Sequence, residues 1–168
     1  FHRILCAVGD KIGADIPICI KGGTLYSIAS GDMIAAECDT NCVFVCIYPD
    51  FTLSTAEAYT KYDENPTEIN PHYADFVSSI VCGSLSEGAG FISNVFTEIY
   101  HDSRIEEMKT DLLESGAVIS EMTGSGSVVF GVFESEETAA YSKKILSGKY
   151  PHVFTTRPVN CGVYVIER

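Results

Sequence analysis

Basic residues are scarce in this sequence. It has 11 Lys and Arg residues against 23 Asp and Glu residues, which gives a formal net charge of −12. A nucleic-acid-binding protein needs a basic surface to displace the counterions of the phosphates, so this balance argues against a nucleic-acid partner. It also argues against an anionic membrane surface. We expect a solvated acidic surface, on which any basic groups that meet an anionic ligand are local.

Long apolar runs are also missing. The longest, over residues 42–48, suits a buried strand and is too short to span a bilayer. The chain does not open on a basic segment followed by an apolar stretch and a small-residue cleavage site, so we expect no secretory signal and a cytoplasmic protein. With 46% hydrophobic and 20% charged residues, the chain should form a globular fold with a buried core.

The cysteines do not suggest a disulfide framework, because there are seven of them, scattered along the chain. Cys19, Cys42 and Cys46 lie in apolar runs, as reduced core thiols do. The spacing of Cys38, Cys42 and Cys46 also invites a metal site, but residues 42–46 have the pattern of a strand and no histidine is near. We predict no metal site.

Hydrophobic periodicity indicates an α+β fold. Phe1, Ile4, Leu5 and Val8 recur with helical spacing. No capping residue and no initiator Met precede them, so we expect the chain to begin inside an element, as a fragment does. Further helices are expected after residue 54 and over 71–81, 91–100, 105–113 and 136–146, with loops at 61–70 and 83–90. Strands are expected at 24–29, 34–37, 42–48, 117–121, 128–133, 153–157 and 162–166.

The order of elements from residue 42 onward mixes helices with strands and ends on consecutive strands. This order predicts an open, largely antiparallel sheet with helices on one face, an arrangement of the ferredoxin-like kind.

Asp15 is the first candidate for chemistry, within Gly-Ala-Asp-Ile-Pro at residues 13–17. A carboxylate there is able to accept a proton from a substrate hydroxyl, as aspartates do in many phosphoryl transfers. Asp before X-Pro is also common in turns, and the spacing alone favours a turn former.

The second candidate is the glycine-rich run Thr-Gly-Ser-Gly-Ser at residues 123–127. Its glycines would let backbone N–H groups approach an anion such as phosphate. The run lacks the Lys of a P-loop and precedes an expected strand, so it is not a Walker motif. A simple tight turn is an equally good interpretation.

The third candidate is Tyr59, one helical turn after Thr55. Its ring is suited to stacking on a base, or it packs in the core as single aromatics usually do. The histidines show no ligand spacing, and we assign them no role.

Taken together, these segments resemble one family, the 4-diphosphocytidyl-2-C-methyl-D-erythritol kinases of the GHMP superfamily. The resemblance runs in order along essentially the whole chain. It is carried by residues 13–17, Lys-Gly-Gly-Thr at 21–24, Ser-Gly-Asp at 30–32, Tyr-Pro at 48–49, Ser-Thr-Ala-Glu-Ala-Tyr at 54–59, Asn94, Ser-Gly-Ala at 115–117 and Met-Thr-Gly-Ser-Gly-Ser at 122–127.

The resemblance implies two lobes, with residues 1–41 as a remnant of the N-terminal lobe and residues 42–168 as the GHMP kinase C-terminal domain. It implies phosphorylation of the substrate's 2-hydroxyl by ATP with Mg²⁺, in isoprenoid precursor synthesis by the methylerythritol phosphate route. Asp15 would be the base, and Tyr59 would stack on the cytosine beside Thr55. Residues Gly124, Ser125 and Gly126 would face the phosphates.

Two departures from the family pattern concern the Asn94 segment. Val95 stands where Asp often follows the Asn, and Thr97 stands where Glu is common. The family's glycine- and serine-rich ATP loop does not occur in these 168 residues, so we expect little kinase activity from this chain alone.

Three functions stay open at this point. They are this kinase, another GHMP kinase acting on homoserine or mevalonate, and a non-catalytic ferredoxin-like binding module. The expected partners are a cytidine diphosphate alcohol and ATP, and a homodimer is among the expected states.

Overall fold

The computed structural model describes residues 1–13, 15–27, 33–36, 41–66, 72–82, 85–164 and 166. The chain forms two compact units, which we call the first unit (residues 1–39 with 158–168) and the second unit (residues 40–157). The sequence-based division lay two residues from this boundary, between 41 and 42. It differs at the C-terminus, because residues 158–168 group with the first unit.

The first unit contains two short helices and a two-stranded sheet. Its elements are α1 (His2–Gly9), α2 (Ile16–Lys21), β1 (Thr24–Ser27) and β2 (Met33–Ala36). The strands pair antiparallel, with Tyr26 opposite Ile34. Helix α2 was not predicted; it begins with Pro17 in its first turn, where a missing N–H costs nothing. The predicted turn at 30–32 lies outside the described residues.

The C-terminal segment joins the first unit through its backbone. The N–H of Gly162 donates to the Lys21 carbonyl (3.2 Å), and that of Val163 donates to the Ile20 carbonyl (3.1 Å). The His2 ring is hydrogen-bonded to the Val163 carbonyl. These bonds go to the end of a helix, so the strand predicted over 162–166 is wrong for its described residues.

The second unit is built on a four-stranded antiparallel sheet in the order β4-β5-β3-β6. The strands are β3 (Val43–Tyr48), β4 (Ile119–Met122), β5 (Val129–Phe133) and β6 (His152–Thr156). Central strand β3 pairs with both β5 and β6, and Val45 lies between Gly131 and Thr155. The predicted α+β class and antiparallel sheet are therefore confirmed.

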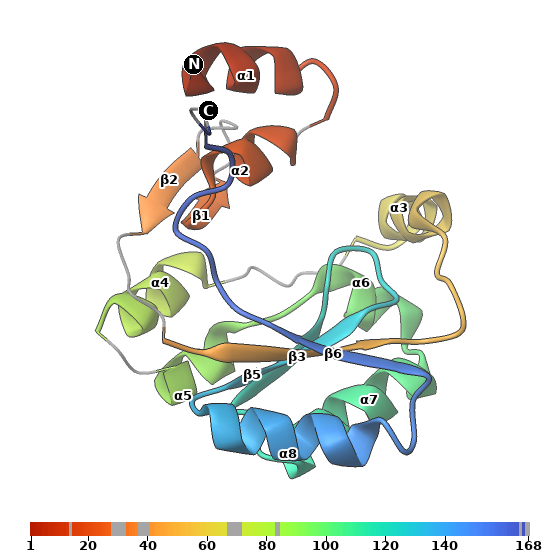
Figure 1. Cartoon of the computed structure of the whole chain (residues 1–168). Helices are drawn as coiled ribbons and strands as arrows, with labels where there is room; N and C mark the ends of the chain where they lie inside the picture. Colours follow the sequence, from red (N-terminus) through yellow and green to blue (C-terminus); the bar gives the residue numbers. More distant parts are fainter. Residues whose placement is uncertain are drawn as a thin grey trace. The chain divides into compact units, whose positions relative to one another are not determined.

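Helices lie on both faces of this sheet (Figure 1). The inward side chains of one face, such as Val45 and Phe133, pack against α7 (Ser103–Glu114) and α8 (Glu136–Leu146). The sequence predicted helices on one face only, but helices also pack on the opposite face. There a smaller cluster around Val132 packs against residues of α4 (Tyr73–Val81), α5 (Leu85–Gly88) and the 3-10 helix η1 (Ala89–Phe91).

Two further helices, α3 (Thr55–Glu64) and α6 (Val95–Tyr100), complete the second unit and contact each other. Several boundaries differ from the prediction. Helix α3 runs four residues into the expected loop at 61–70, α5 lies in the expected loop at 83–90, and α6 begins four residues later than expected. No helix in the described ranges is long and apolar enough to cross a membrane.

The described cysteines divide between core and surface. Cys42 and Cys46 are buried as expected, and burial raises the pKa of the Cys46 thiol. Cys19 is exposed, which corrects its assignment to the core. Cys38 lies outside the described residues, so the spacing of Cys38, Cys42 and Cys46 is not tested.

Candidate functional site

Helix α3 begins at a capped turn that carries one of the predicted site residues. Ser54 is the N-cap, and its hydroxyl accepts a hydrogen bond from the Glu57 N–H at 3.3 Å. Thr55 is thereby left for another partner. Its Oγ1 lies 2.8 Å from the Oγ of Ser125, a hydrogen bond across 70 positions of sequence. The Ser-Thr-Ala segment and the glycine-rich turn therefore meet in the fold.

The glycine-rich run forms the turn between β4 and β5. The turn is closed by hydrogen bonds from the Thr123 N–H to the Val128 carbonyl (2.9 Å) and from the Gly126 N–H to the Thr123 carbonyl (3.0 Å). Gly124 and Gly126 have φ of +56° and +93°, which side chains disfavour. Within the described residues, the N–H groups of Gly124 and Ser125 donate to no protein acceptor. The turn thus offers two adjacent donors to an anion.

Gly126 also serves close packing. A Cβ at this position would lie 2.7 Å from the Met122 Sδ and 2.8 Å from the Leu53 Cδ1. At Gly124, by contrast, a Cβ would meet no atom within 4 Å. Gly124 therefore lies at the open side of the turn, while Gly126 is packed against the β4 end and the approach to α3.

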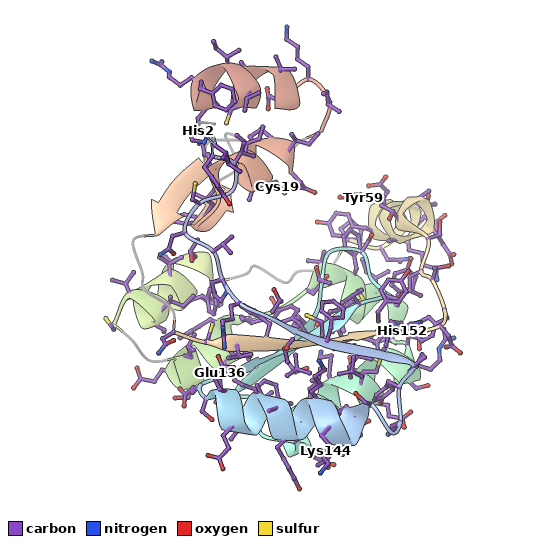
Figure 2. All side chains as sticks on the ribbon, in the orientation of Figure 1. His2, Cys19, Tyr59, Glu136, Lys144 and His152 are labelled. Carbon is purple, nitrogen blue, oxygen red and sulfur yellow. The ribbon has the colours of Figure 1, made fainter. Side chains whose placement is uncertain are left out.

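Tyr59 lies on α3 and is 56% exposed. Figure 2 labels it on this helix. Its ring meets the ring of Phe96 edge to face, with centroids 5.1 Å apart. The Phe96 ring supports one side of Tyr59, and more than half of the Tyr59 side chain stays open to a flat partner.

A second aromatic of α6 fixes the start of α3. The Tyr100 hydroxyl donates to the Ser54 carbonyl at 2.9 Å, and the Lys61 Nζ lies 4.8 Å from the Tyr100 ring centroid. Burial, and then the nearby Glu57 carboxylate, raise the pKa of Tyr100, so the phenol stays protonated as a donor.

The Asn94 segment, whose role the sequence left in doubt, contacts this site. The Asn94 side chain donates to the carbonyls of Met122 (2.7 Å) and Gly124 (2.8 Å). Thr97 donates to the buried Glu121 at 2.8 Å, and Lys109 pairs with the other Glu121 oxygen at 3.2 Å. Sequence reasoning missed Phe96 and Tyr100 entirely, since nothing in their spacing distinguishes them from core aromatics.

Asp15 belongs to the first unit. It holds the N-cap position of α2, and its main-chain carbonyl accepts from the Cys19 N–H at 3.2 Å. Its side chain, however, makes no capping hydrogen bond and is exposed. The carboxylate is therefore available for another partner. Thr55, Tyr59 and the turn belong to the second unit.

Comparison with known proteins gives relatives of one kind. No protein-family model matches the chain. The chain is 30% identical over 161 residues to 4-diphosphocytidyl-2-C-methyl-D-erythritol kinase of Caldanaerobacter subterraneus subsp. tengcongensis. That match covers 95% of this chain and 56% of the relative, so the chain spans little more than half the length of the curated relatives it matches.

Solved structures of similar fold have lower sequence identity. Homoserine kinase from Cytophaga hutchinsonii matches with a TM-score of 0.68 at 19% identity, covering 89% of this chain and 53% of the other. A 4-(cytidine 5'-diphospho)-2C-methyl-D-erythritol kinase matches with a TM-score of 0.68 at 16% identity, covering 90% and 55%. The fold is thus one that solved kinases of different names share. Over nearly its whole length, the chain is similar to part of the 4-diphosphocytidyl-2-C-methyl-D-erythritol kinases.

Proposed function

We propose that this chain supplies part of an ATP-dependent kinase that phosphorylates the 2-hydroxyl of 4-diphosphocytidyl-2-C-methyl-D-erythritol, in isoprenoid precursor synthesis by the methylerythritol phosphate route. The observation that carries the proposal is the Thr55–Ser125 hydrogen bond, which joins two motifs of the resemblance at one site. The similarity to kinases of that name over 95% of the chain supports it. We place the reaction in the cytoplasm.

Asp15 would act as the general base. Its exposed carboxylate would accept the proton of the 2-hydroxyl while the hydroxyl oxygen forms a bond to the γ-phosphorus of ATP. The bond between that phosphorus and the bridging oxygen breaks, and ADP leaves. An Asp in this role needs to be a free acceptor, which the unbonded side chain of Asp15 satisfies among the described residues.

The second unit would bind the two anionic substrates. The N–H groups of Gly124 and Ser125 would donate to phosphate oxygens, and Gly126 lets the turn close tightly enough to present them. Tyr59 would stack on the cytosine, with Thr55 at the same end of α3. Mg²⁺ would be carried by ATP and would screen its phosphate charge. The described residues hold no cluster of three metal-binding side chains, so the proposal assigns the ion no protein ligand.

Another GHMP kinase activity is the second candidate. It is favoured by the homoserine kinase structure, whose TM-score equals that of the cytidine-dependent kinase. A substrate panel with the full-length protein separates the two. We expect ADP release with ATP and 4-diphosphocytidyl-2-C-methyl-D-erythritol, and little with homoserine or mevalonate. Turnover of homoserine or mevalonate in preference to the cytidine substrate would refute the proposal.

The mass of the same preparation in solution tests the expected homodimer.

Asp15→Asn tests the base. Since the amide cannot accept the proton in the same way, we expect kcat to fall about a hundred- to ten-thousandfold, with an unchanged melting temperature. Asp10→Asn is the matched control, because Asp10 is also exposed and follows α1 in the same unit. Equal effects of the two substitutions, measured by coupled ADP release, would remove Asp15 from the mechanism.

Tyr59→Leu tests cytosine stacking. Loss of one base–aromatic stack should raise KM for the cytidine substrate about tenfold, and KM for ATP should not change. Tyr141→Leu is the matched control, since Tyr141 on α8 is 61% exposed, close to the 56% of Tyr59. If both variants keep the wild-type KM, the stacking role is wrong although the kinase assignment stands.

A further inference from the structure

The Asn94 side chain uses both of its ends. Its Nδ2 donates to the carbonyls of Met122 and Gly124, and its Oδ1 accepts from the Phe96 N–H at 2.9 Å. A reversed amide would set Oδ1 against two carbonyl oxygens and Nδ2 against an N–H donor, so only this orientation is compatible with all three bonds. One half-buried residue thus caps α6 and holds the glycine-rich turn.

The bond to the Gly124 carbonyl determines where the next N–H points. The peptide between Gly124 and Ser125 is trans, and a trans peptide is planar with its C=O and N–H in opposite directions. With the carbonyl held by Asn94, the Ser125 N–H is directed away from Asn94. Among the described residues that N–H has no acceptor.

Without such a contact, this peptide plane would be restrained only by the hydrogen bonds that close the turn and by the Ser125 side chain. Gly124 has a positive φ, and no atom lies within 4 Å of where its Cβ would be, so neither a side chain nor packing restricts it. On the far side of the peptide, the Ser125 side chain is held by Thr55 at 2.8 Å. Asn94 therefore supplies the restraint on the carbonyl side.

We propose that Asn94 is a positioning residue that locks the Gly124–Ser125 peptide, so that the Ser125 N–H is presented to a phosphate oxygen of the nucleotide. The identity of that anion rests on the proposed function, whereas the lock itself does not. A donor oriented before the substrate binds costs no reorganisation in the transition state, which is why its loss should affect the rate more than the fold.

Asn94→Asp separates the restraint on the Gly124–Ser125 peptide from the capping of α6. The substitution keeps the size of the side chain and an oxygen that caps α6 equally well, but it removes both donors to the turn. In the full-length protein we expect the Ser125 amide to lose its fixed orientation, so that its ¹⁵N order parameter falls from about 0.85 toward 0.6. We also expect the shift of that amide in a ¹⁵N NMR titration with inorganic pyrophosphate to weaken, and kcat/KM for ATP to fall about ten- to a hundredfold.

Two controls separate positioning from general destabilisation. Ser135→Ala removes the N-cap of α8, and it should lower the melting temperature without changing the Ser125 amide. In Asn94→Asp, acidification protonates the new carboxyl and returns one donor, so the ratio of its kcat/KM to that of the wild type should rise toward low pH. Because protonation also removes the new negative charge, the recovery supports the positioning role only if the ¹⁵N order parameter of the Ser125 amide recovers with it.

The outcomes are distinguishable from those of the proposed function. The wild type could lack kinase activity while Asn94→Asp still makes the Ser125 amide more mobile. In that case the proposed function fails, but the restraint of the Gly124–Ser125 peptide by Asn94 is supported. An unchanged ¹⁵N order parameter of the Ser125 amide in Asn94→Asp would overturn the proposed role of Asn94, whatever the activity. So would an equal effect of Ser135→Ala on that amide.

Discussion

Helices α1 and α7 have the same kind of apolar stripe and opposite environments. In α7, Ile105, Met108 and Leu112 are at most 1% exposed. In α1, Ile4 and Val8 are 69% and 55% exposed, and Phe1 just before it is 68% exposed. The difference lies in what each helix packs against. Helix α7 covers a face of the four-stranded sheet, whereas α1 packs against the short helix α2 and is hydrogen-bonded through His2 to the C-terminal segment.

The two units are accordingly stabilised in different ways. The second unit has a core of side chains between a sheet and its helices. In the first unit, Pro17 and Ile20 of α2 are buried, and backbone hydrogen bonds tie the C-terminal segment to α2. An amphipathic pattern therefore specifies a helix, while a second element must supply the burial that stabilises it.

The largest effect is expected from Leu112, a fully buried residue of α7. Leu112→Ala should lower the free energy of unfolding of the second unit by about 3 kcal/mol, because a fully buried side chain leaves a cavity. Ile4→Ala is the matched control and should change the stability of the chain by less than about 0.5 kcal/mol. Urea titrations followed by hydrogen exchange of β5 amides measure the second unit, and exchange of the Asp10 amide, which is bonded to the Cys6 carbonyl at the end of α1, measures the first. Similar costs for the two substitutions would show that α1 is buried in solution.

The sequence predicted most of what depends on local pattern. The bounds of α8 match the expected 136–146, and β3 falls within the expected strand, because their apolar spacing and their caps or turns agree. Helix α2 and the end of α3 were missed, since residues 13–17 suggested a turn and residues 61–70 a loop. The C-terminal segment was read as a strand because its valines suit one, yet its N–H groups bond to the end of α2.

The site was predictable only in part, for a related physical reason. Tyr59 and the turn were candidates from their residue types, and the resemblance favoured them and added Thr55, but the contacts of Thr55 and the turn are long-range. The Thr55–Ser125 bond and the bonds of Asn94 join segments 28 to 70 positions apart, which no local pattern encodes. Asn94 was noticed through the resemblance alone, and the departures at Val95 and Thr97 hid its role.

A smaller effect is expected in the first unit at Gly162, where the C-terminal segment contacts α2. A Cβ there would lie 1.9 Å from the Cys19 carbonyl oxygen, so Gly162→Ala must push the C-terminal segment away from α2. We expect the loss of two backbone hydrogen bonds, worth about 2 kcal/mol together, and exchange of the Val163 amide about thirtyfold faster. Gly90→Ala is the matched control, because a Cβ at Gly90 meets nothing within 4 Å. Unchanged exchange at Val163 would mean that this close approach does not exist in solution.

The smallest effect concerns the capping difference between the two helices. Asp102 caps α7 and accepts from the Arg104 side chain, whereas α1 has no capping side chain. The hydrogen bond from Arg104 lowers the pKa of Asp102 in the folded state. The unfolded state therefore binds more protons between that lowered pKa and the ordinary value of about 3.9. Stability from this group is complete above the ordinary value and is lost as the pH falls through the folded-state pKa.

Asp102→Asn keeps a cap but removes the titrating group and its ion pair with Arg104. Since Arg104 is largely exposed, the variant should lose only about 0.5 kcal/mol at neutral pH. Chemical denaturation at a series of pH values should show the two proteins converging as the pH falls below about 4. Asp10→Asn, at the C-cap of α1, should leave the acid limb of the stability curve unchanged, because that helix has no such pair. A constant gap between Asp102→Asn and the wild type down to pH 2 would show that the Arg104 pair contributes nothing to the stability of α7.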